Sequence, residues 1–242
     1  KELNITKDKF LSIIAHDLKS PISGFICITK ILAENMDLLT LEEVKEYSKN
    51  LFESSTTLYR LLENLLEWSR IQRGKTDFNP TELDLHYLAK ANLEIQNEVA
   101  KQKEIKLVNS IPEGMRAIAD VAMINTVLRN LLSNSIKFTP RRGIVEIGAV
   151  LENIVDIDNK SSNIVKVYVK DNGIGMREEI IQKLFKLDQK VSRLGTENEP
   201  STGLGLILCK EFIEKHNGKI WVESQEGQGS TFYFTLSKSF DN

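Results

Sequence analysis

Residues 10–21, FLSIIAHDLKSP, place a histidine in a helix-like pattern of apolar residues, with an acid beside it. A neutral imidazole is a nucleophile near physiological pH, so His16 can accept a transferred group as well as a proton. A histidine on a helix is ordinarily a surface or packing residue, so this stretch alone does not decide its chemistry. We interpret His16 as a phosphate acceptor, for which the rest of the chain must bring the donor.

A second set of polar residues recurs along the predicted helix 120–137. Asn130, Asn134 and Lys137 are spaced four and three apart, so they share one face beside an apolar stripe. Two amides and an ammonium on one face suit phosphates and a hydrated cation, because Mg²⁺ prefers oxygen ligands and keeps several waters. Alone, this pattern would usually be a solvated helix face.

The sequence Asp171-Asn-Gly-Ile-Gly175 follows a predicted strand at 164–170. A carboxylate at a strand end can accept a hydrogen bond from a ligand amine, and glycines allow backbone to pack close to a flat ring. The alternative is a simple glycine turn.

Two further glycine motifs lie downstream. Thr202-Gly-Leu-Gly205 opens a predicted helix over 203–217, where free N–H groups and the helix dipole favour phosphate. GQGST, at 227–231, lies between the last two predicted strands, and a hairpin turn is the simpler interpretation of it. The stretch between Gly175 and Gly203 is long for a loop in a compact domain, which is typical of a lid or a disordered segment.

The elements that position His16 are two long predicted helices, over 1–34 and 41–73, joined by a connector at 35–40. Pro21 is expected to kink the first helix, and Thr40 with Glu43 predicts a capping box at the start of the second. Val44, Leu51, Leu58 and Leu65 recur every seven residues along the second helix. Two such hairpins would bury both seams as a four-helix bundle, so we expect a homodimer; the alternative is that the pair folds back on the next domain.

A linker at 75–80 separates this hairpin, residues 1–74, from a predicted α+β domain at 81–242. Its expected strands are 81–84, 105–110, 115–119, 144–151, 164–170, 219–224 and 230–237, and its expected helices are 85–103, 120–137 and 203–217. The polar stretch 152–163 is predicted to be an exposed hairpin tip. The pattern favours a sandwich with helices on one face of a mixed sheet.

Composition excludes several classes of protein. The 242 residues carry a formal net charge of −2, which gives no sign of a general nucleic-acid or anionic-membrane binder. No membrane segment or signal peptide is recognisable, so we expect a cytosolic piece of a longer protein. Cys27 and Cys209 match no metal spacing and are predicted to be buried free thiols, and His86 and His216 to be structural.

In this order, the motifs resemble those of bacterial sensor histidine kinases of two-component systems, over essentially the whole chain. FLSIIAHDLKSP is similar to that family's histidine box, NLLSNSIKFT (130–139) to its asparagine box and DNGIGM (171–176) to its first glycine box. Leu184 and Phe185 fit its phenylalanine box, and the two later motifs, TGLGL (202–206) and GQGST, resemble its remaining glycine boxes. Each motif is weak alone, but the ordered set is specific.

The resemblance implies a dimerisation and phosphotransfer hairpin, which forms a four-helix bundle as a dimer, followed by a Bergerat-type ATP-binding α/β sandwich. It implies ATP and Mg²⁺ as cofactors, autophosphorylation on His16, and phosphoryl transfer to an aspartate on a response regulator receiver domain. It also implies that the chain is the cytoplasmic portion of a larger bacterial sensor protein, which can be membrane-anchored.

Residue roles follow from the same resemblance. Asp171 would bind the adenine amino group, and Asn134 would ligate Mg²⁺. Asp17 would orient or deprotonate the ring of His16. The remaining expected contacts to the nucleotide are Asn130 and Lys137 at the phosphates, Phe138 against the nucleotide, and Gly173, Gly175, Thr202, Gly203, Leu204 and Gly205 where backbone approaches it.

Two departures bear on the reaction. ATP-hydrolysing relatives of the Hsp90 and MutL type carry glutamate where this chain has Asn130, and an amide cannot act as a general base, so transfer to His16 is favoured over hydrolysis. Phosphatase activity in the family is associated with Thr or Asn where this chain has Ser20, whose hydroxyl could still orient a water. Phosphatase activity therefore stays open. So do the other classes: an ATP-driven conformational clamp and a silent ATP-binding scaffold.

Overall fold

The computed structural model describes the backbone of residues 2–72, 78–155, 161–186, 193–197, 199 and 204–239. Within these ranges it leaves out the side chains of residues 2–17, 20, 60, 64, 67–72, 154, 155, 161, 162 and 204. The chain divides into two compact units, Lys1–Thr76 and Asp77–Asn242, each of which is described by itself.

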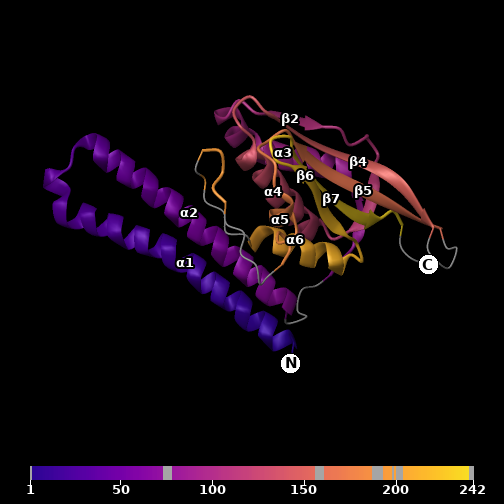
Figure 1. Ribbon diagram of the computed structural model, residues 1–242, viewed down its shortest axis with the longest axis horizontal. Helices are drawn as coiled ribbons and strands as arrows, with labels where there is room; N and C mark the ends of the chain where they lie inside the picture. The colour runs from indigo at the N-terminus through magenta and orange to yellow at the C-terminus, as the bar shows by residue number, and fades with distance from the viewer. Residues whose placement is uncertain are drawn as a thin grey trace. The chain divides into compact units, whose positions relative to one another are not determined.

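The first unit is a helical hairpin made of α1 (Glu2–Asn35), a short 3₁₀ turn η1 (Met36–Leu38) and α2 (Leu41–Gln72) (Figure 1). Helix α1 continues through Pro21. The capping box forms as predicted: the Glu43 carboxylate accepts from the Thr40 N–H at 2.8 Å, and the Thr40 hydroxyl accepts from the Glu43 N–H at 3.3 Å. The predicted helices and their connector are confirmed.

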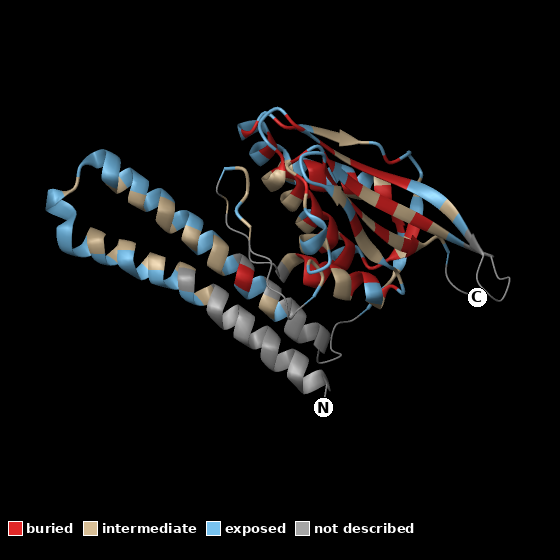
Figure 2. Cartoon of the chain, in the orientation of Figure 1, coloured by how far each residue is buried: buried red, intermediate tan, exposed pale blue. Residues whose placement is uncertain are grey.

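Half-buried and exposed residues alternate along helix α2 (Figure 2), and the apolar residues among them form two rows. The predicted heptad positions Val44, Leu51, Leu58 and Leu65 are half-buried. A second row with the same spacing, Phe52, Tyr59 and Leu66, is exposed, with relative exposures of 73%, 63% and 51%. Large apolar side chains exposed in a continuous row mark a surface that packs on something else.

The second unit is built on a mixed sheet whose described strands run in the order β1–β3–β7–β5–β4–β2, with β6 also paired to β7. Strands β2 and β4 are parallel, and the other pairs are antiparallel. The strands are β1 (Thr81–Asp84), β2 (Lys106–Asn109), β3 (Arg116–Ala119), β4 (Ile144–Val155), β5 (Ser161–Asp171), β6 (Ile220–Gln225) and β7 (Gly229–Ser237).

Three helices cover one face of this sheet: α3 (Leu85–Gln102), α4 (Val121–Phe138) and α6 (Leu204–Lys215) (Figure 1). Alternation along β5 sets that face, because Val165, Val167 and Val169 are buried while the residues between them point the other way. The predicted α+β sandwich is confirmed. A short helix, α5 (Glu178–Ile181), lies within the stretch predicted to be a long loop.

Two predictions need correction. Strands β4 and β5 form the expected hairpin, but they are longer than predicted, because they stay paired out to Val155 opposite Ser161; a ladder satisfies backbone groups even where the side chains are polar. Cys27 is exposed, because a two-helix hairpin has only one buried face, whereas Cys209 is buried as predicted. Among the described residues, the helices lack the combination of length and apolarity that crossing a membrane requires.

Candidate functional site

Helix α4 positions the predicted cluster of amides and ammonium. The Asp120 carboxylate begins the helix by accepting from the N–H groups of Ala122 and Met123 at 3.0 and 3.1 Å. Its apolar stripe is fully buried: Met123, Ile124, Val127, Leu128, Leu131, Leu132 and Ile136. Burial of this stripe fixes the rotation of the helix, so Asn130, Asn134 and Lys137 lie together on the adjacent half-buried face.

Asn130 and Asn134 differ in their contacts. Asn130 Nδ2 donates to the Thr126 carbonyl at 3.0 Å. Its Oδ1 packs against Gly205, because a Cβ added at Gly205 would lie only 2.6 Å from this oxygen. Asn130 therefore fixes where α6 begins against α4. Within the described part of the chain, the Asn134 side chain makes no hydrogen bond, so its amide oxygen is available to a ligand.

Asp171 is the last residue of β5 and is only 4% exposed. Its Oδ1 accepts from the N–H groups of Gly173 at 2.9 Å and Ser230 at 3.2 Å. Both bonds go to the same oxygen, which leaves Oδ2 for a further donor. Burial raises the pKa of the Asp171 carboxyl, while the Gly173 and Ser230 N–H groups and the Ser135 hydroxyl act against this rise.

Ser135 is a buried neighbour of this carboxylate. Its hydroxyl lies close enough to lower the pKa of Asp171, yet it makes no hydrogen bond of good geometry in the described chain. A buried hydroxyl without a partner costs free energy unless a ligand satisfies it. The carboxylate and the hydroxyl together fit an adenine edge, which offers an amine donor and a ring-nitrogen acceptor.

The packing of the protein itself leaves no room for a side chain at the two glycines after Asp171. A Cβ at Gly173 would lie 2.3 Å from the Phe138 carbonyl oxygen, and one at Gly175, where φ is +59°, would lie 1.9 Å from that of Gln225. The Gly227 N–H donates to the Ile174 carbonyl at 2.9 Å. GQGST is thus both the β6–β7 hairpin turn and a brace for the Asp171 loop. Approach of this backbone to a nucleotide stays a prediction.

The stretch between Gly175 and Gly203 is described only in part. Arg193 Nη1 donates to the Gly175 carbonyl at 2.7 Å, and the Thr196 N–H donates to the Lys137 carbonyl at 3.0 Å. This stretch therefore contacts both the glycine loop and the end of α4. Thr202 and Gly203 lie outside the described residues, as does the side chain of Leu204, the first residue of α6.

These residues fit ATP and Mg²⁺. Asp171 and Ser135 suit adenine, and the Asn134 amide and Lys137 lie together on one face for phosphates and a cation. Lys137 Nζ is 5.3 Å from the centre of the half-buried Phe138 ring. The described residues contain no group of three or more His, Cys, Asp or Glu that could hold a metal. A divalent ion here would therefore take its ligands from an amide, phosphates and water rather than from a carboxylate cage.

The predicted phosphate acceptor lies in the other unit. His16 and Asp17 are in α1, and their side chains, like that of Ser20, lie outside the described residues. Their roles stay predictions.

The comparisons with known proteins decide the family. Residues 119–239 match the sequence model of the histidine kinase-, DNA gyrase B- and HSP90-like ATPases, and residues 6–74 match that of the His Kinase A (phospho-acceptor) domain. The chain belongs to the sensor histidine kinases. Its phospho-acceptor match contains His16, and its ATPase match contains Asn130, Asn134 and Asp171.

Curated relatives of this sensor histidine kinase are longer proteins. It is 32% identical over 237 residues to the adaptive-response sensory kinase SasA of Crocosphaera subtropica, covering 95% of this chain and 59% of that one. It is 31% identical over 234 residues to the non-motile and phage-resistance protein of Caulobacter vibrioides, covering 96% of this chain and 27% of that one.

Solved structures share the fold. The Acinetobacter baumannii histidine kinase AdeS, 21% identical, superposes with a TM-score of 0.70 over 93% of this chain and 98% of its own. The histidine kinase ThkA in complex with response regulator protein TrrA, 24% identical, gives a TM-score of 0.69 over 95% of this chain and 61% of its own.

His216 holds the start of α4 in place. Its Nε2 accepts from the Asp120 N–H at 2.9 Å and its Nδ1 donates to the Phe212 carbonyl at 2.7 Å, a pattern that requires the neutral ring. The ring of Phe78 meets it edge-on at 4.9 Å. Burial lowers the pKa of His216 more than the Phe212 carbonyl and Asp120 raise it. The structural role predicted for His216 is confirmed.

This arrangement predicts acid sensitivity. Since the folded pKa lies below the unfolded value of about 6.5, the stabilisation is complete above that pH and is lost as pH falls through the folded pKa. Thermal unfolding of wild type and His216→Gln should be compared at about pH 7.5 and about pH 5.5. At the higher pH, His216→Gln should unfold at a lower temperature than wild type. On acidification, its unfolding temperature should fall by less than that of wild type. Equal losses in both proteins would contradict this account.

Sequence reasoning missed two functional residues. Ser135 lies one position after Asn134, but a serine in an apolar helix carries no signal of its orphaned hydroxyl. Ser230 belongs to GQGST, but only strand pairing brings its N–H to Asp171, through the register of β5 and β7.

Proposed function

We propose that the chain uses ATP to phosphorylate His16 and passes the phosphoryl group to an aspartate on a response regulator receiver domain. The observation that supports this best is the pairing of a phospho-acceptor domain containing His16 with an ATPase domain in which the Ser135 hydroxyl, beside Asp171, is buried without a hydrogen-bond partner in the described chain.

In the nucleotide site, the free oxygen of Asp171 accepts from the adenine amine, and the Ser135 hydroxyl bonds the neighbouring ring nitrogen. Lys137 holds the phosphates at the end of α4, and the Asn134 amide oxygen offers a cation ligand. Mg²⁺, when bound, neutralises phosphate charge and lowers the barrier to displacement at the γ-phosphorus. Asn130 supplies an amide rather than a general base, so this position does not activate water.

The transfer is a displacement at the γ-phosphorus. A ring nitrogen of neutral His16 forms the new N–P bond, the bond to the β–γ bridging oxygen breaks, and ADP leaves with that electron pair. Asp17 orients the ring or takes up its remaining proton as positive charge develops. Positioning and charge neutralisation account for most of the rate in this kind of reaction.

We infer that the chain acts as a homodimer. The exposed row Phe52, Tyr59 and Leu66 on α2, together with Ile22 and Ile26 on α1 at 42% and 59% exposure, leaves the hairpin with a large apolar surface. A second copy would bury these side chains in a four-helix bundle. Because these side chains are 42–73% exposed, burial of what remains would contribute about 0.6–2 kcal/mol for each one.

The chain spans 59% and 27% of the length of the two curated relatives described above, and the first of these is a sensory kinase by name. We infer that it is the cytoplasmic portion of a larger bacterial sensor. ThkA, which shares the fold, was solved in complex with a response regulator, which supports a receiver domain as the partner here.

A transfer experiment tests the proposed function. The chain is labelled with γ-labelled ATP, freed of nucleotide, and mixed with a receiver domain or with the same domain carrying asparagine at its acceptor aspartate. Label should move to the intact receiver within minutes and stay on the kinase with the variant receiver. A chain that never gains label, but releases phosphate steadily, would instead support the ATP-driven clamp. Faster loss of label from the receiver when kinase and ADP are added would show phosphatase activity, for which Ser20 would orient water.

A further inference from the structure

Lys103 is a buried lysine that the nucleotide site does not yet explain. It is the C-cap of α3, and its side chain is only 4% exposed. A buried ammonium persists only where its hydrogens are satisfied and its charge is compensated. Its hydrogen-bond partners therefore indicate which segments of the chain it joins.

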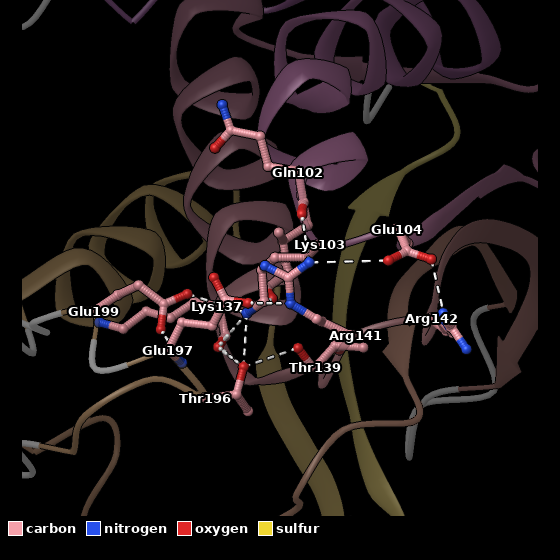
Figure 3. Close-up of polar contacts among 11 residues, drawn as sticks. Gln102, Lys103, Glu104, Lys137, Thr139, Arg141, Arg142, Thr196, Glu197 and Glu199 are labelled. Atoms are coloured by element: carbon pink, nitrogen blue, oxygen red, sulfur yellow. Dashed lines mark hydrogen bonds and ion pairs between the residues drawn. The ribbon is translucent and has the colours of Figure 1, made fainter.

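The partners of Lys103 come from two separate segments (Figure 3). Nζ donates to the carbonyls of Ile136 and Lys137 at 3.0 and 3.1 Å, at the end of α4, where the helix dipole favours a cation. It also donates to the Thr196 hydroxyl at 2.7 Å and the Glu199 carboxylate at 3.1 Å. Lys103 thus joins the end of α4 to residues 195–197 and 199, which we call the segment 195–199; Asn198 lies outside the described residues.

The segment 195–199 contacts the helix turn that carries Lys137. The Thr196 N–H and hydroxyl both donate to the Lys137 carbonyl, at 3.0 and 3.2 Å, and the hydroxyl also lies 3.0 Å from the Thr139 carbonyl. A Cβ at Gly195 would be 2.6 Å from Lys137 Cγ. The segment therefore packs against the aliphatic part of the Lys137 side chain.

The segment is closed by its own hydrogen bonds around Glu199. The Gly195 N–H donates to the Glu199 carbonyl at 2.9 Å, and the Glu197 N–H donates to the Glu199 carboxylate at 2.8 Å. Arg141 adds an outer ion pair with Glu197 at 2.8 Å, but both side chains are more than a third exposed, so this pair contributes little. Lys103 is buried and the Glu199 side chain is 34% exposed, so their ion pair is the better shielded of the two and holds the turn against α4.

We propose that Lys103 is a positioning residue for nucleotide: through Thr196 and Glu199 it fixes this segment against Lys137 and so aims the Lys137 ammonium. The inference rests on the proposed function, in which Lys137 holds the phosphates. Lys103 acts on the nucleotide site only through Thr196 and Glu199. Its loss weakens nucleotide binding, whereas the rate at saturating ATP changes little because bound phosphates themselves hold Lys137.

The test compares Lys103→Met, Glu199→Gln and the double variant with wild type and with Arg116→Ala, a matched control. Arg116 forms an exposed ion pair with Glu82 at 2.8 Å between β1 and β3 of the same unit. The measurements are affinity for a fluorescent ATP analogue, autophosphorylation against ATP concentration, thermal unfolding, and hydrogen exchange at the Gly195 and Thr196 amides.

Lys103→Met should raise both the Kd for the analogue and the KM for ATP by about tenfold, with kcat within about twofold of wild type. Glu199→Gln keeps the shape of the turn, so it should give a smaller rise of about threefold. The double variant should raise the Kd and KM no more than Lys103→Met does alone, because both substitutions break the same contact. Exchange at Gly195 and Thr196 should quicken in all three variants and not in Arg116→Ala.

An unchanged Kd in Glu199→Gln and Lys103→Met, with wild type binding nucleotide, overturns the inference alone. A fall in kcat at unchanged KM also overturns it, because it would indicate a structural role. If Lys103→Met does not fold, Glu199→Gln decides the matter by the same two readouts. Failure of the wild type to bind nucleotide overturns the proposed function and this inference together.

Discussion

Replacing His16 by glutamine is expected to reduce incorporation of label from γ-labelled ATP to background, while nucleotide affinity stays at the wild-type value. Glutamine keeps hydrogen-bonding groups of similar reach but has no nucleophilic nitrogen, so the N–P bond cannot form. The acceptor and the nucleotide site belong to separate units of the chain, which is why binding should survive. Filter binding of the labelled chain and titration with an ATP analogue measure the two effects.

His86→Gln is the matched control for this prediction. His86 is half-buried in the second unit, where its Nδ1 contacts the Ile111 carbonyl at 2.7 Å and has no part in the proposed transfer. This variant should incorporate label normally. Normal incorporation by His16→Gln would mean that another residue accepts the phosphoryl group.

Asp171→Asn is expected to weaken nucleotide binding by roughly one to two orders of magnitude, the worth of a hydrogen bond to a buried charge. The asparagine Oδ1 can still accept from the Gly173 and Ser230 N–H groups. Its Nδ2, however, is a hydrogen-bond donor and would face the adenine amine, which is also a donor, so that hydrogen bond would be lost. Isothermal titration with a non-hydrolysable ATP analogue measures the loss.

The same variant should be at least as thermally stable as wild type. Burial raises the pKa of Asp171, so the folded state prefers the protonated carboxyl, and stability falls as pH rises from the unfolded value of about 3.9 through the folded pKa. A neutral amide removes that cost. Asp84→Asn is the matched control, since Asp84 Oδ1 caps α3 and asparagine is an equally good cap, so binding should not change. Lost binding together with a lower unfolding temperature would show that Asp171 is chiefly structural.

Elements whose signals are local in the sequence could be predicted. The capping box at Thr40, the heptad of α2 and the shared face of Asn130, Asn134 and Lys137 depend on spacings of three, four and seven residues, which a helix turns directly into neighbours. The succession of strand and helix patterns indicated the sandwich, and the order of the motifs indicated the nucleotide site.

Features that depend on distant contacts could not be predicted. Nothing near Lys103 in the sequence indicates a carboxylate and a hydroxyl more than ninety residues away, and the orphaned Ser135 hydroxyl exists only once β5 packs on α4. The length of β4 and β5 was underestimated because side-chain polarity says little about a ladder made of backbone hydrogen bonds. The wrong prediction for Cys27 had a similar cause, since apolar neighbours in sequence need not cover a side chain in space.

The most direct test of the proposed reaction is to follow the γ-phosphate of ATP in the wild-type chain. Label should accumulate on the protein as an acid-labile, base-stable phosphoramidate within the peptide that contains His16, with little free phosphate released. Free phosphate accumulating steadily, with no label on that peptide, would contradict transfer to His16 and show that the site hydrolyses ATP.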